Sequence, residues 1–145
     1  MLGTFSGESI PLPYAPMRTM NCPCGSGEFL QACCGNWIAG RKGAPTAEAL
    51  MRSRYTAYVL EDVDYLVNTT LPASCTPDLA DSIRQWMKQV EWQRLHVLNA
   101  EAGTRSDTEG TVEFVAEFIG PEGANRHHER AEFNRVRGIW YYVSD

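Results

Sequence analysis

Four cysteines crowded into one short segment constrain the fold of this chain more than any other feature. Cys22 and Cys24 form a C-x-C pair, and eight residues later Cys33 and Cys34 form a C-C pair, so four of the five cysteines share one segment. A segment this small cannot bury enough apolar surface to fold alone, and needs a covalent or metal link. The first question is therefore which link joins these sulfur atoms.

One zinc ion held by the thiolates of Cys22, Cys24, Cys33 and Cys34 accounts best for the pattern, because zinc accepts four sulfur ligands at about 2.3 Å in tetrahedral geometry. Pro23 stiffens the first pair, and glycines at 25 and 27 allow the backbone to reverse. Four protein ligands leave no coordination position for water, so we expect a structural and not a catalytic ion.

Three alternatives to zinc remain. Two disulfides would need oxidising surroundings, but the first twenty residues show no signal peptide and no apolar run is long enough to span a bilayer. We therefore expect a cytoplasmic protein without membrane contact. A redox dithiol usually has C-x-x-C spacing, and the "GSG" that follows Cys24 lacks the full phosphate-loop pattern. Cys75 stands apart and is interpreted as a free, partly buried structural thiol.

Charge limits the partners. A net charge of -5 and a pI of about 5.2 argue against broad electrostatic binding to nucleic acid or to anionic lipid. Arg18, Arg41 and Lys42 near the cysteines leave a weak nucleic-acid contact open. Three prolines among the first twenty residues favour a flexible N-terminal arm over residues 1–20.

Helices are predicted after the cysteine segment. Glycines and Pro45 mark a linker from Cys34 onwards, within which Trp37 and Ile38 are expected to pin a knuckle of residues 21–38 to a domain of residues 45–145. Thr46 can cap a first helix. Residues 61–72 are expected to prolong this helix or to form a second short helix after it. Another helix is expected to begin at Thr76, with Pro77 suited to its first position.

The second half changes to a strand period. Strands are predicted over 91–101, 111–120, 129–136 and 139–143, with loops over 103–110 and 120–126 and a hairpin turn at Arg137–Gly138. Val112, Phe114, Ala116 and Phe118 alternate onto one face. Helices followed by an antiparallel meander predict an α+β fold, in which a curved sheet and its helices form a cone with a mouth.

The segment "CPCGSGEFLQACC" resembles the SEC-C motif, the zinc-binding segment at the C-terminus of SecA and in many uncharacterised bacterial proteins. Residues 50–70, 90–95 and 128–143 are similar to the YchJ-like proteins, a family that carries this motif. The resemblance implies the same four cysteine ligands, and a nuclear-transport-factor-two-like, or ketosteroid-isomerase-like, cone. Several family members carry a second motif at the C-terminus, which this sequence lacks, so functions that need two knuckles are not expected.

Five polar residues are candidates for a pocket in the cone. Arg54 falls within an apolar helical stripe, Glu61 lies two turns further on, and three strand residues share the inward parity of Phe133. The candidates are Arg54, Glu61, His127, Glu129 and Arg135. Arg54 is interpreted either as a snorkelling or ion-paired arginine that fixes the helix against the sheet, or as a pocket cation that binds a carboxylate or phosphate. No catalytic residue is assigned.

Three functions are compatible with these residues. The first is a non-catalytic zinc-binding protein whose knuckle is a protein-interaction module, on a cone that binds a partner or small ligand. In SecA the similar motif is associated with binding to the SecB chaperone and the ribosome, which implies a secretion-chaperone or ribosome-associated partner. The second is a pocket enzyme, a lyase, isomerase or hydrolase, with Arg54 as substrate anchor. The third is a structural accessory domain.

Overall fold

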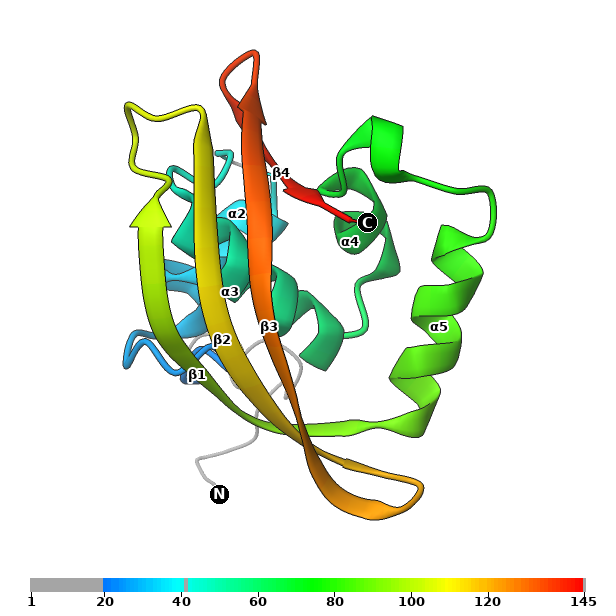
Figure 1. The fold of residues 1–145 in the computed structure, drawn as a ribbon. Helices are drawn as coiled ribbons and strands as arrows, with labels where there is room; N and C mark the ends of the chain where they lie inside the picture. Colours follow the sequence, from blue (N-terminus) through cyan, green and yellow to red (C-terminus); the bar gives the residue numbers. More distant parts are fainter. Residues whose placement is uncertain (1–19, 41, 145) are drawn as a thin grey trace, which may run out of the picture.

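The computed structural model describes residues 20–40 and 42–144, and all but the last residue of the expected N-terminal arm lies outside this range. Helical elements come first, and four strands follow them in the chain (Figure 1). The helical elements are η1 (Leu30–Ala32), α2 (Cys34–Ile38), α3 (Ala47–Val59), α4 (Val63–Asn68), η2 (Pro72–Ser74) and α5 (Leu79–Gln89). The strands are β1 (Glu91–Ala102), β2 (Glu109–Gly120), β3 (Gly123–Val136) and β4 (Ile139–Val143).

The strands form one antiparallel sheet in the order β1-β2-β3-β4. Its three long strands curve together, α3 crosses one face of the sheet, and α5 stands beside the sheet (Figure 1). The expected α+β fold, with helices first and a meander second, is confirmed. Thr46 caps α3 as predicted, because its Oγ1 accepts a hydrogen bond of 3.0 Å from the amide of Ala49.

Three expected boundaries were wrong. Residues Cys34–Ile38 form α2 where a linker was expected, because Gly35 permits close packing: a Cβ there would lie 2.6 Å from the carbonyl oxygen of Leu30. Helix α5 begins at Leu79 and not at Pro77, since the Thr76 hydroxyl donates to Asp78 at 2.6 Å and stabilises a turn ahead of the helix.

The loop expected over 120–126 is a tight hairpin. Gly120 pairs with Gly123, whose φ of 102° reverses the chain, so β3 starts six residues earlier than the predicted strand at Glu129. The turn at Arg137–Gly138 is as predicted, with φ of 54° and 82°. No described helix is long and apolar enough to cross a membrane.

The core lies between α3 and the concave face of the sheet. The predicted inward alternation of β2 is confirmed, since Val112, Ala116 and Phe118 are buried and Phe114 packs against them. The same hydrophobic cluster contains four residues of the cysteine segment, which are Cys22, Cys24, Leu30 and Cys34. Packing therefore joins the cysteine segment to the helix and the sheet.

Candidate metal centre and cone cavity

The chain from Asn21 to Phe29 folds back on itself and so brings the two cysteine pairs together. The amide of Cys22 donates to the carbonyl of Glu28 at 2.8 Å, and Asn21 pairs with Phe29 in an antiparallel bridge. Gly25 and Gly27 adopt φ of 81° and 89° in the turn, as the sequence predicts. Helix α2 then starts at Cys34, which faces the first pair.

The four sulfur atoms form a compact group. All lie within 4.8 Å of one another; Cys24 Sγ is 3.6 Å from Cys33 Sγ, which is 4.0 Å from Cys34 Sγ. These separations are too long for disulfide bonds, which measure about 2.05 Å. They match the edge of about 3.8 Å that four sulfurs adopt around a central ion at about 2.3 Å. The donor set therefore fits a tetrahedral metal ion.

Neighbouring groups support the sulfur atoms. The Ser26 hydroxyl donates to Cys33 Sγ at 3.2 Å, and Thr56 Oγ1 on α3 lies 3.6 Å from Cys22 Sγ. Arg52 donates to the carbonyl of Cys24 at 2.9 Å and places a positive charge beside the cluster. The sequence analysis did not identify Arg52 or Thr56, because only the docking of α3 brings them to the cysteine segment.

The thiols of the cluster differ in pKa. The pKa of Cys24 lies below its ordinary value, chiefly because of its hydrogen bond with Cys22, whereas hydrogen bonds with Cys22 and Cys24 raise the pKa of Cys34. Four clustered sulfurs without a cation cannot all ionise, because each negative charge opposes the next. A metal ion would remove that conflict, since it binds thiolates and displaces their protons.

A second feature is a cavity of about 120 Å³ between α3, α5 and the concave face of the sheet. Aromatic side chains make up most of its wall, and Arg54, His127 and Glu129 are the Arg, His and Glu residues that line it. The lining residues are Met51, Arg54, Tyr55, Tyr58, Trp86, Trp92, Phe114, Ala116, His127, Glu129, Ala131, Phe133 and Tyr142.

Arg54 is buried and bonded to neutral oxygens. Its Nη1 donates to the carbonyl of Leu66 at 2.8 Å, to Thr69 Oγ1 at 2.7 Å and to Thr70 Oγ1 at 3.3 Å. Its guanidinium carbon lies 4.5 Å from the centre of the Tyr142 ring. Burial lowers the pKa of Arg54. These contacts fix α3 against α4 and the two residues that follow it, where the sequence analysis expected a snorkelling or ion-paired arginine that fixes the helix against the sheet.

His127, Glu129 and Tyr142 form a hydrogen-bonded chain in the cavity wall. His127 Nε2 lies 2.9 Å from one carboxylate oxygen of Glu129, and the Tyr142 hydroxyl donates to the other oxygen at 2.7 Å. The contact with His127, assisted by the Tyr142 hydroxyl, lowers the pKa of Glu129, and Glu129 raises the pKa of His127. A carboxylate that holds an imidazole in this way can position it for proton exchange.

Two of the expected pocket residues lie elsewhere. Glu61 is exposed with a φ of 59°, since α3 ends at Val59 and the helical count from Arg54 no longer applies. Arg135 lies opposite Trp140 in the β3–β4 pairing, close to the turn, and its guanidinium carbon is 5.9 Å from the centre of the Trp140 ring. It also donates a hydrogen bond to the carbonyl of Arg105. Neither residue lines the cavity: the helical count fails for Glu61 because α3 ends before it, and Arg135 lies beside the β3–β4 turn, beyond the cavity.

Tyr142 lines the cavity, although the sequence analysis did not name it as a pocket residue. The run of residues 139–143 is apolar or aromatic at every position, so its sequence shows no alternation from which the inward face could be identified. Pairing settles the face, because Tyr142 lies opposite Phe133 of β3.

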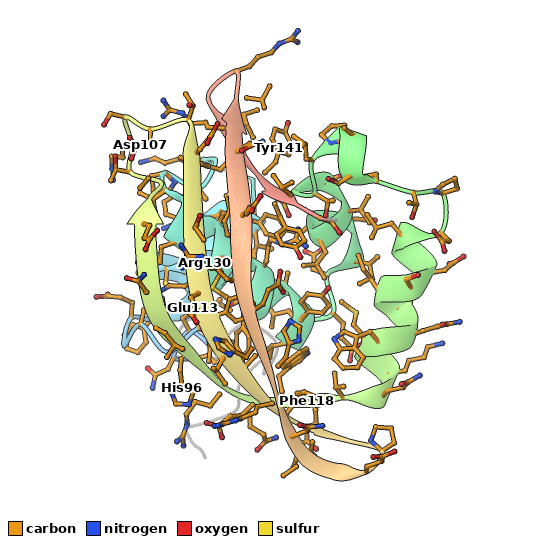
Figure 2. All side chains as sticks on the ribbon, viewed as in Figure 1. His96, Asp107, Glu113, Phe118, Arg130 and Tyr141 are labelled. Carbon is orange, nitrogen blue, oxygen red and sulfur yellow. The ribbon has the colours of Figure 1, made fainter. Side chains whose placement is uncertain are left out.

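The outer face of the sheet carries paired charges. His128 Nε2 lies 2.7 Å from Glu113, and Arg130 donates to Glu101 at 2.8 Å. Figure 2 shows Glu113 and Arg130 on the sheet face opposite the helices. His127 lines the cavity whereas its neighbour His128 contacts Glu113 on the outer face, because successive side chains of a strand point to opposite faces.

Comparisons with known proteins agree with this geometry. Residues 46–145 match the model of the YchJ-like middle domain, described as NTF2-like. The chain is 40% identical over 122 residues to the UPF0225 protein GSU1048 of Geobacter sulfurreducens, across 84% of this chain and 76% of that protein.

Two solved structures share the fold over most of the chain. One is the solution structure of RPA3114, a SEC-C motif containing protein from Rhodopseudomonas palustris, with a TM-score of 0.76, 41% identity and coverage of 86% of this chain and 96% of that chain. The other is the crystal structure of a SEC-C motif containing protein from Psychrobacter arcticus, with a TM-score of 0.73, 30% identity and coverage of 88% and 82%. The predicted cone with an antiparallel sheet is confirmed.

Proposed function

This chain belongs to the YchJ-like family of SEC-C motif proteins, and from that premise we propose that it is a non-catalytic zinc-binding protein whose knuckle is a protein-interaction module. One observation supports the metal above all others: four cysteine sulfurs lie within 4.8 Å of one another without disulfide bonds. Among metals that accept four tetrahedral thiolates, zinc needs no inorganic sulfide and no redox partner.

The knuckle is suited to contact a partner because its two sides differ. Cys22, Cys24, Leu30 and Cys34 are buried on the side that meets the core, and Phe29 is 52% exposed on the other. Residues 25–28 beside Phe29 are exposed as well. A zinc ion would fix this apolar ring in one orientation and lower the entropy lost when a partner binds it.

The partner we propose is a protein, with secretion-chaperone or ribosome-associated proteins as the first candidates by analogy with SecA. A weak nucleic-acid contact is the lesser possibility, because the net charge of -5 opposes a polyanion. The paired charges on the outer sheet face leave no long basic stripe among the described residues.

Elemental analysis and native mass spectrometry test the metal. Protein purified with reductant and without chelators should carry one zinc ion per chain. Cys33→Ser should lose most of it, and Cys75→Ser should keep it, because Cys75 lies outside the cluster. Full-length protein without stoichiometric metal would contradict the proposal, and iron in place of zinc would contradict the identity of the ion.

A matched pair of surface variants tests the interaction. Phe29→Ser should weaken crosslinking to a purified candidate chaperone or ribosome, whereas Ile139→Ser, at a side chain of similar exposure on β4, should not. Equal loss in both variants, or no loss in either, would argue against the knuckle as the contact.

A second candidate function, a small-molecule enzyme, is favoured by the contact of His127 with Glu129 in the cavity wall. His127 would act as the acid–base group and Arg54 would anchor the substrate. A lyase, isomerase or hydrolase activity on small organic acids that disappears in His127→Asn but survives in Cys33→Ser would favour the enzyme over the interaction module.

A further inference from the structure

From the cavity wall we infer that the cone is a binding site for one ring-sized organic carboxylate, with its ring against the aromatic wall and its charge toward Arg54. The inference concerns the cone alone and does not depend on the metal or on the interaction module. Three properties of the described residues support it: the size of the cavity, the chemistry of its wall and the charge of Arg54.

Size limits the ligand first. The cavity measures about 120 Å³, close to the roughly 150 Å³ engineered cavity that holds one benzene molecule, and smaller than the roughly 300–1,000 Å³ of sites for drug-sized ligands. Trp86 is 36% exposed and the His127 side chain 47%, whereas Arg54 is 9% exposed. The first two therefore mark the mouth, and Arg54 lies deeper.

The wall is suited to a flat ring. Trp92 packs edge-on against Tyr55 and Trp86, with ring centres 5.8 Å and 6.1 Å apart, and the sheet adds the rings of Phe114, Phe133 and Tyr142 to the wall. Edge-to-face packing of this kind leaves shallow apolar faces on which another aromatic or alicyclic ring can stack. Burial raises the pKa of Tyr55 to about 12, so its phenol is neutral at physiological pH and adds no negative charge.

Charge selects an anion. A buried cation costs free energy unless a negative group compensates it, and Arg54 contacts only neutral oxygens and a ring within the described part of the chain. Glu129 is the one carboxylate among the described lining residues, and its charge acts on Arg54 at a distance, but no ion pair joins the two side chains; its oxygens are bonded to His127 and Tyr142. All three hydrogen bonds of Arg54 come from Nη1, so a carboxylate could be bound by its other nitrogens.

A charge series tests this inference on the intact, metal-loaded protein. Benzoate, benzamide and benzylamine have similar rings but are anionic, neutral and cationic at neutral pH. In proton–nitrogen correlation spectra, benzoate should shift the indole N–H signal of Trp92 and leave that of Trp140 unchanged. Trp140 does not line the cavity, and its Nε1 donates a hydrogen bond of 3.3 Å to the carbonyl of Pro45. Its affinity should exceed that of benzamide by at least about tenfold, the effect of one charge-assisted contact.

Two variants check the location. Arg54→Met should abolish the preference for benzoate over benzamide, and Arg130→Met on the outer face should retain it. Because Arg54→Met also removes structural contacts, Ala131→Leu supplies a second check: it fills the buried floor and keeps the arginine. Ala131→Leu should weaken binding of both compounds at least about tenfold, whereas Ala100→Leu at an exposed site on β1 should not.

Several results would overturn the inference. They are tighter binding of benzamide or benzylamine than of benzoate, a shift at Trp140 and not at Trp92, or full benzoate binding by Ala131→Leu. The binding experiments with benzoate do not use Cys33→Ser and do not measure zinc. Failure of the carboxylate inference can therefore be distinguished from failure of the metal proposal.

Discussion

Arg54 lies over the ring of Tyr142, with 4.5 Å between its guanidinium carbon and the centre of the ring. This contact joins α3 to β4, the last strand of the sheet. The backbone of Tyr142 adds two hydrogen bonds of 2.8 Å, from its amide to the carbonyl of Thr69 and to its carbonyl from the amide of Leu71. The C-terminal strand is therefore attached to the helical layer at Tyr142, with Arg54 at the centre of the attachment.

Arg54→Met should lower the free energy of unfolding by about 2–3 kcal/mol, because it removes buried charge-assisted hydrogen bonds and a cation–π contact. Urea denaturation followed by tryptophan fluorescence measures the change. Arg84→Met is the control, since Arg84 pairs with Asp81 on the surface and should change stability by less than about 1 kcal/mol. Equal effects in the two variants would show that the contacts of Arg54 contribute no more than a surface pair.

The position of Arg54 on the core side of its helix follows from the helical period, but its partners do not. Leu66 belongs to α4 and Thr69 and Thr70 follow it directly, and only the angle between α3 and α4 brings their oxygens to the guanidinium. Glu61 was expected in the same pocket as Arg54 because the helical period was extended beyond the end of the helix at Val59. Periodicity predicts the face of a residue, whereas its contacts depend on where elements end and how they dock.

Glu129→Gln should lower the pKa of His127, because the charge of Glu129 and its hydrogen bond raise that pKa in the native protein. When the pKa of a histidine is higher in the folded than in the unfolded state, protonation stabilises the fold. This stabilisation is complete at pH values below the unfolded-state pKa of about 6.5. This contribution disappears as the pH rises through the folded value. The lowered pKa of Glu129 stabilises the fold above the unfolded carboxyl value, and that contribution is lost as the pH falls through the folded value.

The pair of His127 and Glu129 should therefore stabilise the fold most in mildly acidic solution, at pH values between the pKa of the carboxyl group and the pKa of the imidazole. Titration of the imidazole carbon-bound protons by NMR measures the pKa of His127, and thermal unfolding across pH gives the stability. Glu132→Gln, at an exposed neighbour on β3, is the control and should leave His127 unchanged. An unchanged His127 titration in Glu129→Gln would contradict the hydrogen bond seen in the structure.

Removing the metal should destabilise the whole chain and not the knuckle alone. Cys22, Cys24 and Cys34 share one core cluster with Leu50 and other residues of α3 and the sheet. We expect Cys33→Ser to lower the melting temperature by about 10 °C, equivalent to a loss of about 2–4 kcal/mol. Amide hydrogen exchange should accelerate at Leu50 and Leu95 as well as in residues 21–38.

Cys75→Ser is the control for this experiment, because Cys75 is exposed and outside the cluster. Faster exchange confined to residues 21–38 would instead support two independent units, the organisation expected from the sequence. The cysteine spacing predicted the sulfur cluster correctly because ligands to one ion must be close in space. It could not reveal the packing of Leu30 and Cys34 against the core, which depends on close approach at Gly35.

Gly110→Ala should lower the free energy of unfolding by about 1–3 kcal/mol, the usual cost of an overpacked interior site. Gly110 is buried where β2 begins, and a Cβ there would lie 2.5 Å from Gly103 Cα and 3.1 Å from Ala47 Cβ. Gly103 is fixed on both sides, since its amide donates to Glu109 at 2.9 Å and its carbonyl accepts from Ala47 at 3.0 Å.

The backbone of Gly103 therefore cannot move aside without breaking the contact that joins the sheet to the start of α3. Gly43→Ala is the matched control, because nothing lies within 4 Å of a Cβ at that exposed glycine. Urea denaturation compares the two variants, and hydrogen exchange at the Ala47 amide should accelerate only in Gly110→Ala. If both variants unfold at the wild-type urea midpoint, the backbone around Gly103 can shift to accommodate the added methyl group. The hydrogen bond from Ala47 to Gly103 would then not be needed to hold the start of α3.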